Sequence, residues 1–136
     1  MRLILAFYFS FISFLCFSQV QKINDTLSLI NSTYLGGELR NFYGNYAPDT
    51  LEMLWKTYLG KGKTTISRKS GDRLWAGSCW TGQPLMIQEG DSLYLLQPTF
   101  NHSLKKISTK HGNIIWSSPF NDVLKGAGTI YYDAKT

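Results

Sequence analysis

The chain has 136 residues, of which 14 are lysine or arginine and 9 are aspartate or glutamate, so its formal net charge is +5. This length allows one domain at most. The positive charges are scattered along the chain, as on solvated strand faces, and we expect no nucleic-acid partner.

The first eighteen residues are typical of a secretory signal peptide. Arg2 supplies a positive charge, residues 3–17 are apolar apart from two serines, and Ser18 followed by Gln19 offers a cleavage point. These fifteen apolar-rich residues are too few for a helix that crosses a bilayer, which needs about 20 residues. We therefore predict a signal peptide at residues 1–18, no stable membrane span after its removal, and export to the periplasm, the cell surface or the medium. An uncleaved membrane anchor and a lipid anchor on Cys16 are the alternatives.

Removal of the signal peptide would leave 118 residues with Cys79 as their one cysteine. No disulfide could then form within the exported chain, so we expect an apolar core to hold the fold. Residues 19–50 are polar and rich in asparagine, glycine and tyrosine, and they are predicted to form a lead-in loop.

Residues 51–136 show short strand patterns and no convincing helix. A strand is expected at residues 51–57, followed by a hairpin with strands at 64–67 and 73–76 around a turn that contains Gly71. Runs of β-branched and aromatic residues bounded by Gly, Pro, Asn or Asp then predict four consecutive antiparallel strands. Their expected ranges are 84–88, 92–97, 103–107 and 113–117, and residues 128–132 are predicted to begin a further strand.

One segment of the chain, residues 65–76, repeats 41 residues later at 106–117. Five of the twelve aligned positions are identical, among them Gly71 with Gly112 and Trp75 with Trp116. A period of about 40–50 residues made of short strands is typical of a β-propeller blade. We therefore expect these four residues to be structural, the glycines in turns and the tryptophans packed between neighbouring sheets.

Alternation along the predicted strands indicates which side chains are buried. Those expected to be buried are Leu93, Leu95, Leu104, Ile107, Ile114 and Trp116. Those expected to be exposed are Lys105, Lys110 and Asn113.

These strands resemble a blade of the PQQ-like (quinoprotein-type) β-propellers. The resemblance rests on Asp91-x-Leu-Tyr-x-Leu and on the glycine–tryptophan spacings Gly71-x-x-x-Trp75 and Gly112-x-x-x-Trp116. It covers residues 64–133, although Lys106 and Ser108 stand where the family has alanine and aspartate. WD40 propellers are the rival family, but no tryptophan of this chain is followed by the aspartate of their signature.

The resemblance implies an all-β fold of four-stranded antiparallel propeller blades, of which residues 51–136 would supply about two. Because a closed propeller needs about 4–8 blades, the chain is expected to be an N-terminal fragment of a longer protein.

Several short strings match catalytic motifs without their context. Gly77-Ser-Cys79-Trp80 matches the tail of a papain-type cysteine-protease signature, but Gly82 and Pro84 would break the helix which that family requires. Gly62-Lys-Thr64 resembles the end of a phosphate-binding loop, but the earlier glycine is missing and a turn is expected. Cys79 is therefore predicted to be a small buried residue without a catalytic role.

Metal ligation also lacks support in the residue pattern. His102 and His111 are separated by eight positions with no acidic or cysteine partner between them, a poor metal spacing. A calcium site of the quinoprotein kind would need converging acidic and amide oxygens, for which Glu89, Asp91 and Asn101 are candidates by residue type alone. We assign no catalytic residue, no metal ligand and no cofactor.

Two functions follow from the resemblance. The first is an exported, non-catalytic PQQ-like β-propeller that acts as a binding or assembly scaffold, with a protein or glycan partner held by its loops. The alternative is the N-terminal part of a quinoprotein-type (PQQ-dependent) dehydrogenase. Dehydrogenases of this kind often carry a vicinal cysteine pair, whereas Cys79 has no neighbouring cysteine, so the scaffold is preferred.

Overall fold

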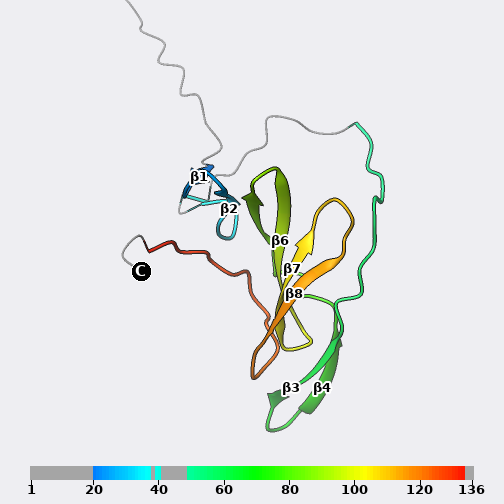
Figure 1. The fold of residues 1–136 in the computed structure, drawn as a ribbon. Helices are drawn as coiled ribbons and strands as arrows, with labels where there is room; N and C mark the ends of the chain where they lie inside the picture. The colour runs from blue at the N-terminus through cyan, green and yellow to red at the C-terminus, as the bar shows by residue number, and fades with distance from the viewer. Residues whose placement is uncertain (1–19, 38, 41–48, 134–136) are drawn as a thin grey trace, which may run out of the picture.

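The computed structural model describes residues 20–37, 39–40 and 49–133 and is all-β over these ranges (Figure 1). The predicted signal peptide at residues 1–18 lies outside them. In this described part there is no helix, and so none long and apolar enough to cross a membrane. The strands are β1 (Gln21–Lys22), β2 (Leu27–Asn31), β3 (Lys61–Ser67), β4 (Gly71–Ala76), β5 (Leu85–Glu89), β6 (Ser92–Thr99), β7 (Ser103–Ser108) and β8 (Ile114–Pro119).

Six of these strands form one antiparallel sheet in the order β1-β2-β5-β6-β7-β8. The strands from β5 to β8 are neighbours in both sequence and space, a meander with short connections (Figure 1). The four consecutive antiparallel strands predicted from the sequence are thus confirmed. Gly90 allows the tight turn between β5 and β6, because its φ of +55° is one that other residues rarely adopt.

Three sequence predictions about strands are wrong. The expected lead-in loop contains β1 and β2, and β2 extends the meander by pairing with β5, where Leu29 is buried. Residues 51–57 are extended but belong to no sheet, because side chains rather than backbone groups attach them to the body. Residues 128–132 form no strand either, and a single backbone bond from Ile130 N–H to the carbonyl of Ser32 joins them to the region after β2.

The repeated segments both form hairpins, but the hairpins differ. Strands β3 and β4 make a separate two-stranded sheet, whereas β7 and β8 belong to the large sheet. Thr65 lies opposite Asp72 in the first hairpin. The aligned Lys106 lies opposite Trp116, three residues beyond the position that the repeat alignment gives. Gly71, which is the first residue of β4 rather than a turn residue, and Gly112, between β7 and β8, both have positive φ.

Burial in the meander follows the position of each strand more than the repeat. Ile107 is buried, Lys110 and Asn113 are exposed, as predicted, and Leu93, Leu95 and Leu104 are half-buried. The predictions for Ile114, Trp116 and Lys105 are wrong. Ile114 and Trp116 are 38% and 41% exposed because β8 is the edge strand. Lys105 is buried because β7 is an interior strand, and its ammonium donates to Ser117 Oγ at 3.1 Å.

Residues 51–60, hereafter the strap, run from one end of the β7–β8 hairpin to the other. Trp55 Nε1 donates to the carbonyl oxygen of Thr109 at 2.6 Å, and the Thr57 hydroxyl donates to the carbonyl of Gly112. At the opposite end Gly60 lies against the side chain of Asn101. The strap therefore brings β3 to the turn between β6 and β7.

Candidate functional site

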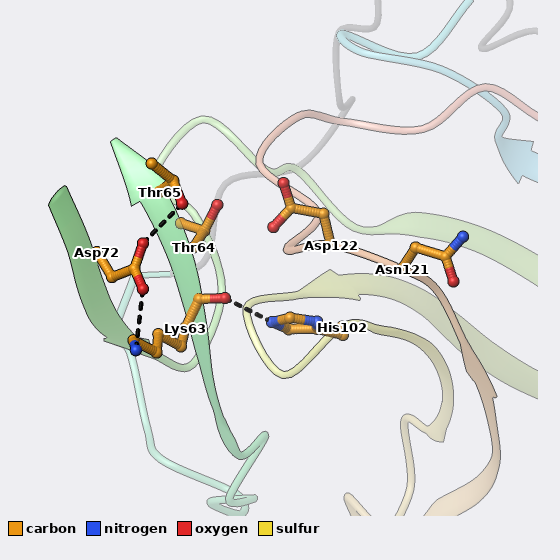
Figure 2. A pocket seen from close by; sticks show the side chains of 7 residues that line it. All are labelled: Lys63, Thr64, Thr65, Asp72, His102, Asn121 and Asp122. Atoms are coloured by element: carbon orange, nitrogen blue, oxygen red, sulfur yellow. Dashed lines mark hydrogen bonds and ion pairs between the residues drawn. The ribbon is translucent and has the colours of Figure 1, made fainter. Parts of the chain in front are cut away.

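A polar pocket of about 250 Å³ opens where the β3–β4 hairpin meets the large sheet (Figure 2). Three separate segments form it: the hairpin itself, the turn between β6 and β7, and the loop after β8. Its lining residues are Lys63, Thr64, Thr65, Asp72, His102, Asn121 and Asp122.

Asp72 is held by a cross-strand network on the hairpin. Its carboxylate accepts a hydrogen bond from the Thr65 hydroxyl at 2.6 Å and an ion pair from the Lys63 ammonium at 2.9 Å (Figure 2). These two bonds, the Thr65 bond first, together with the positive charge of Lys63, lower the pKa of Asp72 below its usual value. Asp72 is therefore an anion at neutral pH.

Asp122 supplies the second carboxylate, from the loop after β8. One of its oxygens accepts the backbone N–H of Val123 at 2.7 Å. This bond is the main cause of a lowered pKa at Asp122, followed by a bond from the Thr64 hydroxyl and by electrostatic interaction with Lys125 and His102. The pocket thus presents two ionised carboxylates from different segments.

His102 joins the large sheet to the hairpin. Its Nε2 lies 3.0 Å from the carbonyl oxygen of Lys63, and since a carbonyl only accepts, Nε2 must carry the proton (Figure 2). The backbone of His102 has a φ of +59°, a left-handed conformation that is uncommon outside glycine. Its own carbonyl accepts the N–H of Phe120 at 2.7 Å, which fixes this turn against the chain that leaves β8.

The contact between hairpin and sheet leaves no room for larger residues at two positions. A side chain at Gly62 would overlap the carbonyl oxygen of Phe100, and one at Gly60 would meet Asn101. Gly62-Lys63-Thr64 is therefore part of strand β3, not the turn predicted from the sequence. The close approach of backbones is what brings Lys63 and Thr64 to His102.

The lining of this pocket is polar and largely charged. Its lining combines the carboxylates of Asp72 and Asp122 with the amide of Asn121, two threonine hydroxyls, the ammonium of Lys63 and the imidazole of His102. The carboxylate oxygens can only accept hydrogen bonds when ionised. Because both carboxylates have lowered pKa values, neither is a proton donor near neutral pH, as a general acid would have to be. The arrangement suits a ligand that carries hydroxyl or ammonium groups.

The structure does not bring the calcium candidates together. Glu89 forms an ion pair with Lys106, Asn101 accepts from Thr99 within the β6–β7 turn, and Asp91 lies in the exposed turn between β5 and β6. Over the described residues, no three His, Cys, Asp or Glu side chains are grouped so that they could hold a metal ion.

Cys79 is half-buried after β4, with its Sγ 3.1 Å from the Thr81 hydroxyl. Hydrogen bonds from Thr81, the side-chain bond first, lower the pKa of the Cys79 thiol. Neither histidine is hydrogen-bonded to this thiol within the ranges that the structure describes; His102 lies in the pocket and His111 in the exposed β7–β8 turn.

The structural-repeat tryptophans occupy corresponding strands of the two hairpins. Trp75 on β4 contacts Phe100, with ring centroids 5.4 Å apart, and both line a second cavity of about 360 Å³. Trp116 on β8 has no ring contact among the described residues.

Sequence reasoning missed the carboxylates of the polar pocket, since Asp72 falls in a predicted turn and Asp122 in no motif. The one available signal is that Asp72 lies in a predicted turn and Asp122 follows a predicted strand.

Comparison with known proteins gives no match, whether to a family model, to a curated protein or to a solved structure. The pocket and the sequence pattern are thus the grounds on which a function can be proposed.

Proposed function

We propose that this chain is an exported, non-catalytic binding scaffold built on a PQQ-like β-propeller blade, and that its polar pocket takes a protein or glycan partner. The pocket is the observation that carries the proposal. A strand hairpin, a turn and a loop converge on it, and its carboxylates are held by bonds from Lys63, Thr65 and Val123.

The blade assignment is supported by the β5–β8 meander and by the repeated hairpin. Four antiparallel strands in sequence order are what one propeller blade contains. Gly71 and Gly112, aligned in the repeat, both take positive φ. Rigid strands that carry short loops are the usual platform for binding sites.

Export is proposed from the N-terminal residues, which have the charge, apolar stretch and cleavage point of a signal peptide. Outside the cell, abundant ligands with hydroxyl and ammonium groups include glycans and lysine-rich protein segments. Both match a pocket whose acceptors are carboxylate, amide and hydroxyl oxygens.

The test is a binding measurement with matched carboxylate variants. The purified chain is titrated by calorimetry with a panel of oligosaccharides and of lysine-containing peptides, alongside Asp122→Asn and the control Asp91→Asn. Asp91 is an exposed carboxylate in the β5–β6 turn, outside the pocket. Binding should weaken about tenfold or more in Asp122→Asn, because a charged acceptor is worth about 1.5–3 kcal/mol, and should be unchanged in Asp91→Asn.

Two results would overturn the proposal. One is that Asp91→Asn and Asp122→Asn bind every ligand alike, since the pocket would then not be the site. The other is tight binding of a quinone cofactor with calcium, which would favour the dehydrogenase alternative.

A further inference from the structure

The second cavity, hereafter the aromatic cavity, is formed around the end of β4. Its volume is about 360 Å³, and its lining residues are Trp75, Ser78, Cys79, Trp80, Phe100 and Lys125. Phe100 is buried, with its ring centroid 5.4 Å from that of Trp75, whereas Trp80 is 95% exposed. None of these six residues lines the polar pocket, so the aromatic cavity is a separate place for a ligand.

A further cavity, of about 580 Å³, adjoins the aromatic cavity. The two share Ser78, and the further cavity adds residues of the strap, among them Lys56 and Tyr58, which are both exposed. The bond from Gly77 N–H to the carbonyl oxygen of Gly60, at 2.9 Å, holds the strap against the chain that follows β4. Exposed aromatic rings therefore line both cavities.

The charge of the two cavities has one sign. Lys56 and Lys125 are among their lining residues, and no aspartate or glutamate is, over the part of the chain that the structure describes. Lys125 interacts electrostatically with Asp122, but Asp122 lines the polar pocket instead. A concave surface lined by one sign of charge attracts a ligand of the opposite sign. These cavities thus suit an anion, which the two carboxylates of the polar pocket would repel.

The exposed indole of Trp80 favours a ligand that has ring faces. One face of a sugar ring presents C–H bonds while the hydroxyl groups project around its edge, so the ring can lie on an aromatic side chain and keep its hydroxyls in water. With 95% of its surface exposed, Trp80 can accept such a ring without any rearrangement. A wholly apolar ligand would gain more from an enclosed cavity that removes its surface from water.

A single strand of nucleic acid also combines flat rings with negative charge. Grooves that bind it follow the backbone with a basic side chain for each contacted phosphate, and two lysines are too few for that. We propose that the aromatic cavity binds an acidic polysaccharide, with one sugar ring stacked on Trp80 and a sugar carboxylate paired with Lys125. Because the site is separate from the polar pocket, this inference does not depend on the proposed function.

The first test addresses the charge of the ligand. The purified chain is titrated by calorimetry with a short oligogalacturonate and with its methyl ester, which has the same rings without the charge. The charged form should bind about threefold more tightly, as one exposed ion pair allows, and high salt should remove the difference. Lys125→Gln should also remove it. The control Lys69→Gln, in the exposed β3–β4 turn outside both cavities, should retain it.

The second test addresses the stacking. Because Trp80 is almost fully exposed, Trp80→Ala should keep the melting temperature of the unchanged chain. It should weaken binding of both forms of the oligosaccharide about fivefold and remove the change in tryptophan fluorescence that the ligand causes. Trp116→Ala is the control, because Trp116 lies on β8 and lines neither cavity. That variant should retain both the affinity and the fluorescence change.

Several results would overturn the proposal. These are no binding of the oligogalacturonate at millimolar concentration, equal binding of its charged and esterified forms, and unchanged binding in Trp80→Ala. Tighter binding of a single-stranded oligonucleotide would do so as well. Asp122→Asn separates this site from the polar pocket, since it should not weaken binding of the oligogalacturonate. A loss of affinity in that variant would place the acidic sugar in the polar pocket and contradict the inference.

Discussion

At the scale of single residues, Gly62 decides whether the β3–β4 hairpin can dock on the large sheet. A Cβ there would overlap the carbonyl oxygen of Phe100, a backbone atom that cannot move without shifting the turn that positions His102. Gly62→Ala should therefore lower the free energy of unfolding by about 1–3 kcal/mol, the usual cost of overpacking. Urea denaturation measures this, with Gly126→Ala as the control, because a Cβ at Gly126 meets nothing within 4 Å. Equal stability of the two variants would contradict the close approach.

The carboxylate of Asp72 makes the stability of the folded chain depend on pH. Bonds in the folded chain lower the pKa of Asp72, so the unfolded chain binds its proton more tightly. The stabilisation that Asp72 provides is therefore fully present above the unfolded pKa of about 3.9 and is lost as pH falls through the lower folded value. The melting temperature of Asp72→Asn should lie below that of the unchanged chain at pH 7, and the difference should shrink below about pH 4. A difference that stays constant down to about pH 2 would show that the charge of Asp72 does not contribute.

At the scale of elements, the meander could be predicted from sequence because each strand carries its own local signal. The strands β5 to β8 are short β-branched or aromatic runs between turn residues, and Gly90 takes the positive φ that its turn needs. No such signal marks β2, whose five residues lie in a polar region and become a strand by pairing with β5, more than fifty residues away. The strand conformation of β2 therefore depends on its pairing with a strand that is distant in the sequence, as is often the case for strands.

The strap and the edge strand show the limit of alternation patterns. Residues 51–57 have the composition of a strand, yet Trp55 attaches the strap through its indole N–H. Alternation assigns Lys105 and Trp116 to environments opposite to the ones they occupy. Which strand is interior and which is at the edge depends on the order of the sheet, and no local pattern contains that order. The pocket could not be predicted from local patterns either. Asp72 and Asp122 are fifty residues apart in the sequence and are brought to the same pocket by the docking of the hairpin.

At the scale of the whole molecule, the described chain consists of a six-stranded sheet and a smaller two-stranded sheet that contact each other beside the β6–β7 turn. The contacts between them include the bond from His102 Nε2 to the carbonyl of Lys63, the bond from Phe100 N–H to the carbonyl of Gly77, and the ring contact of Trp75 with Phe100. Most of β4 is exposed, whereas β6 and β7 have paired strands on both sides. The two sheets should therefore differ in local stability, since isolated two-stranded hairpins are marginal in water.

Native-state hydrogen exchange should resolve this difference. Amides of β6 and β7 should exchange slowest, through opening of the whole sheet, and those of β3 and β4 should exchange faster, through undocking of the hairpin. Gly62→Ala should accelerate exchange in β3 and β4 more than in β6 and β7, because it disturbs the contact that docks the hairpin. Since the same undocking separates Asp72 from His102, ligand bound in the pocket should slow exchange of the hairpin amides. Uniform protection across both sheets would mean that they open as one cooperative unit. The contact that forms the pocket would then open no more easily than the sheets themselves.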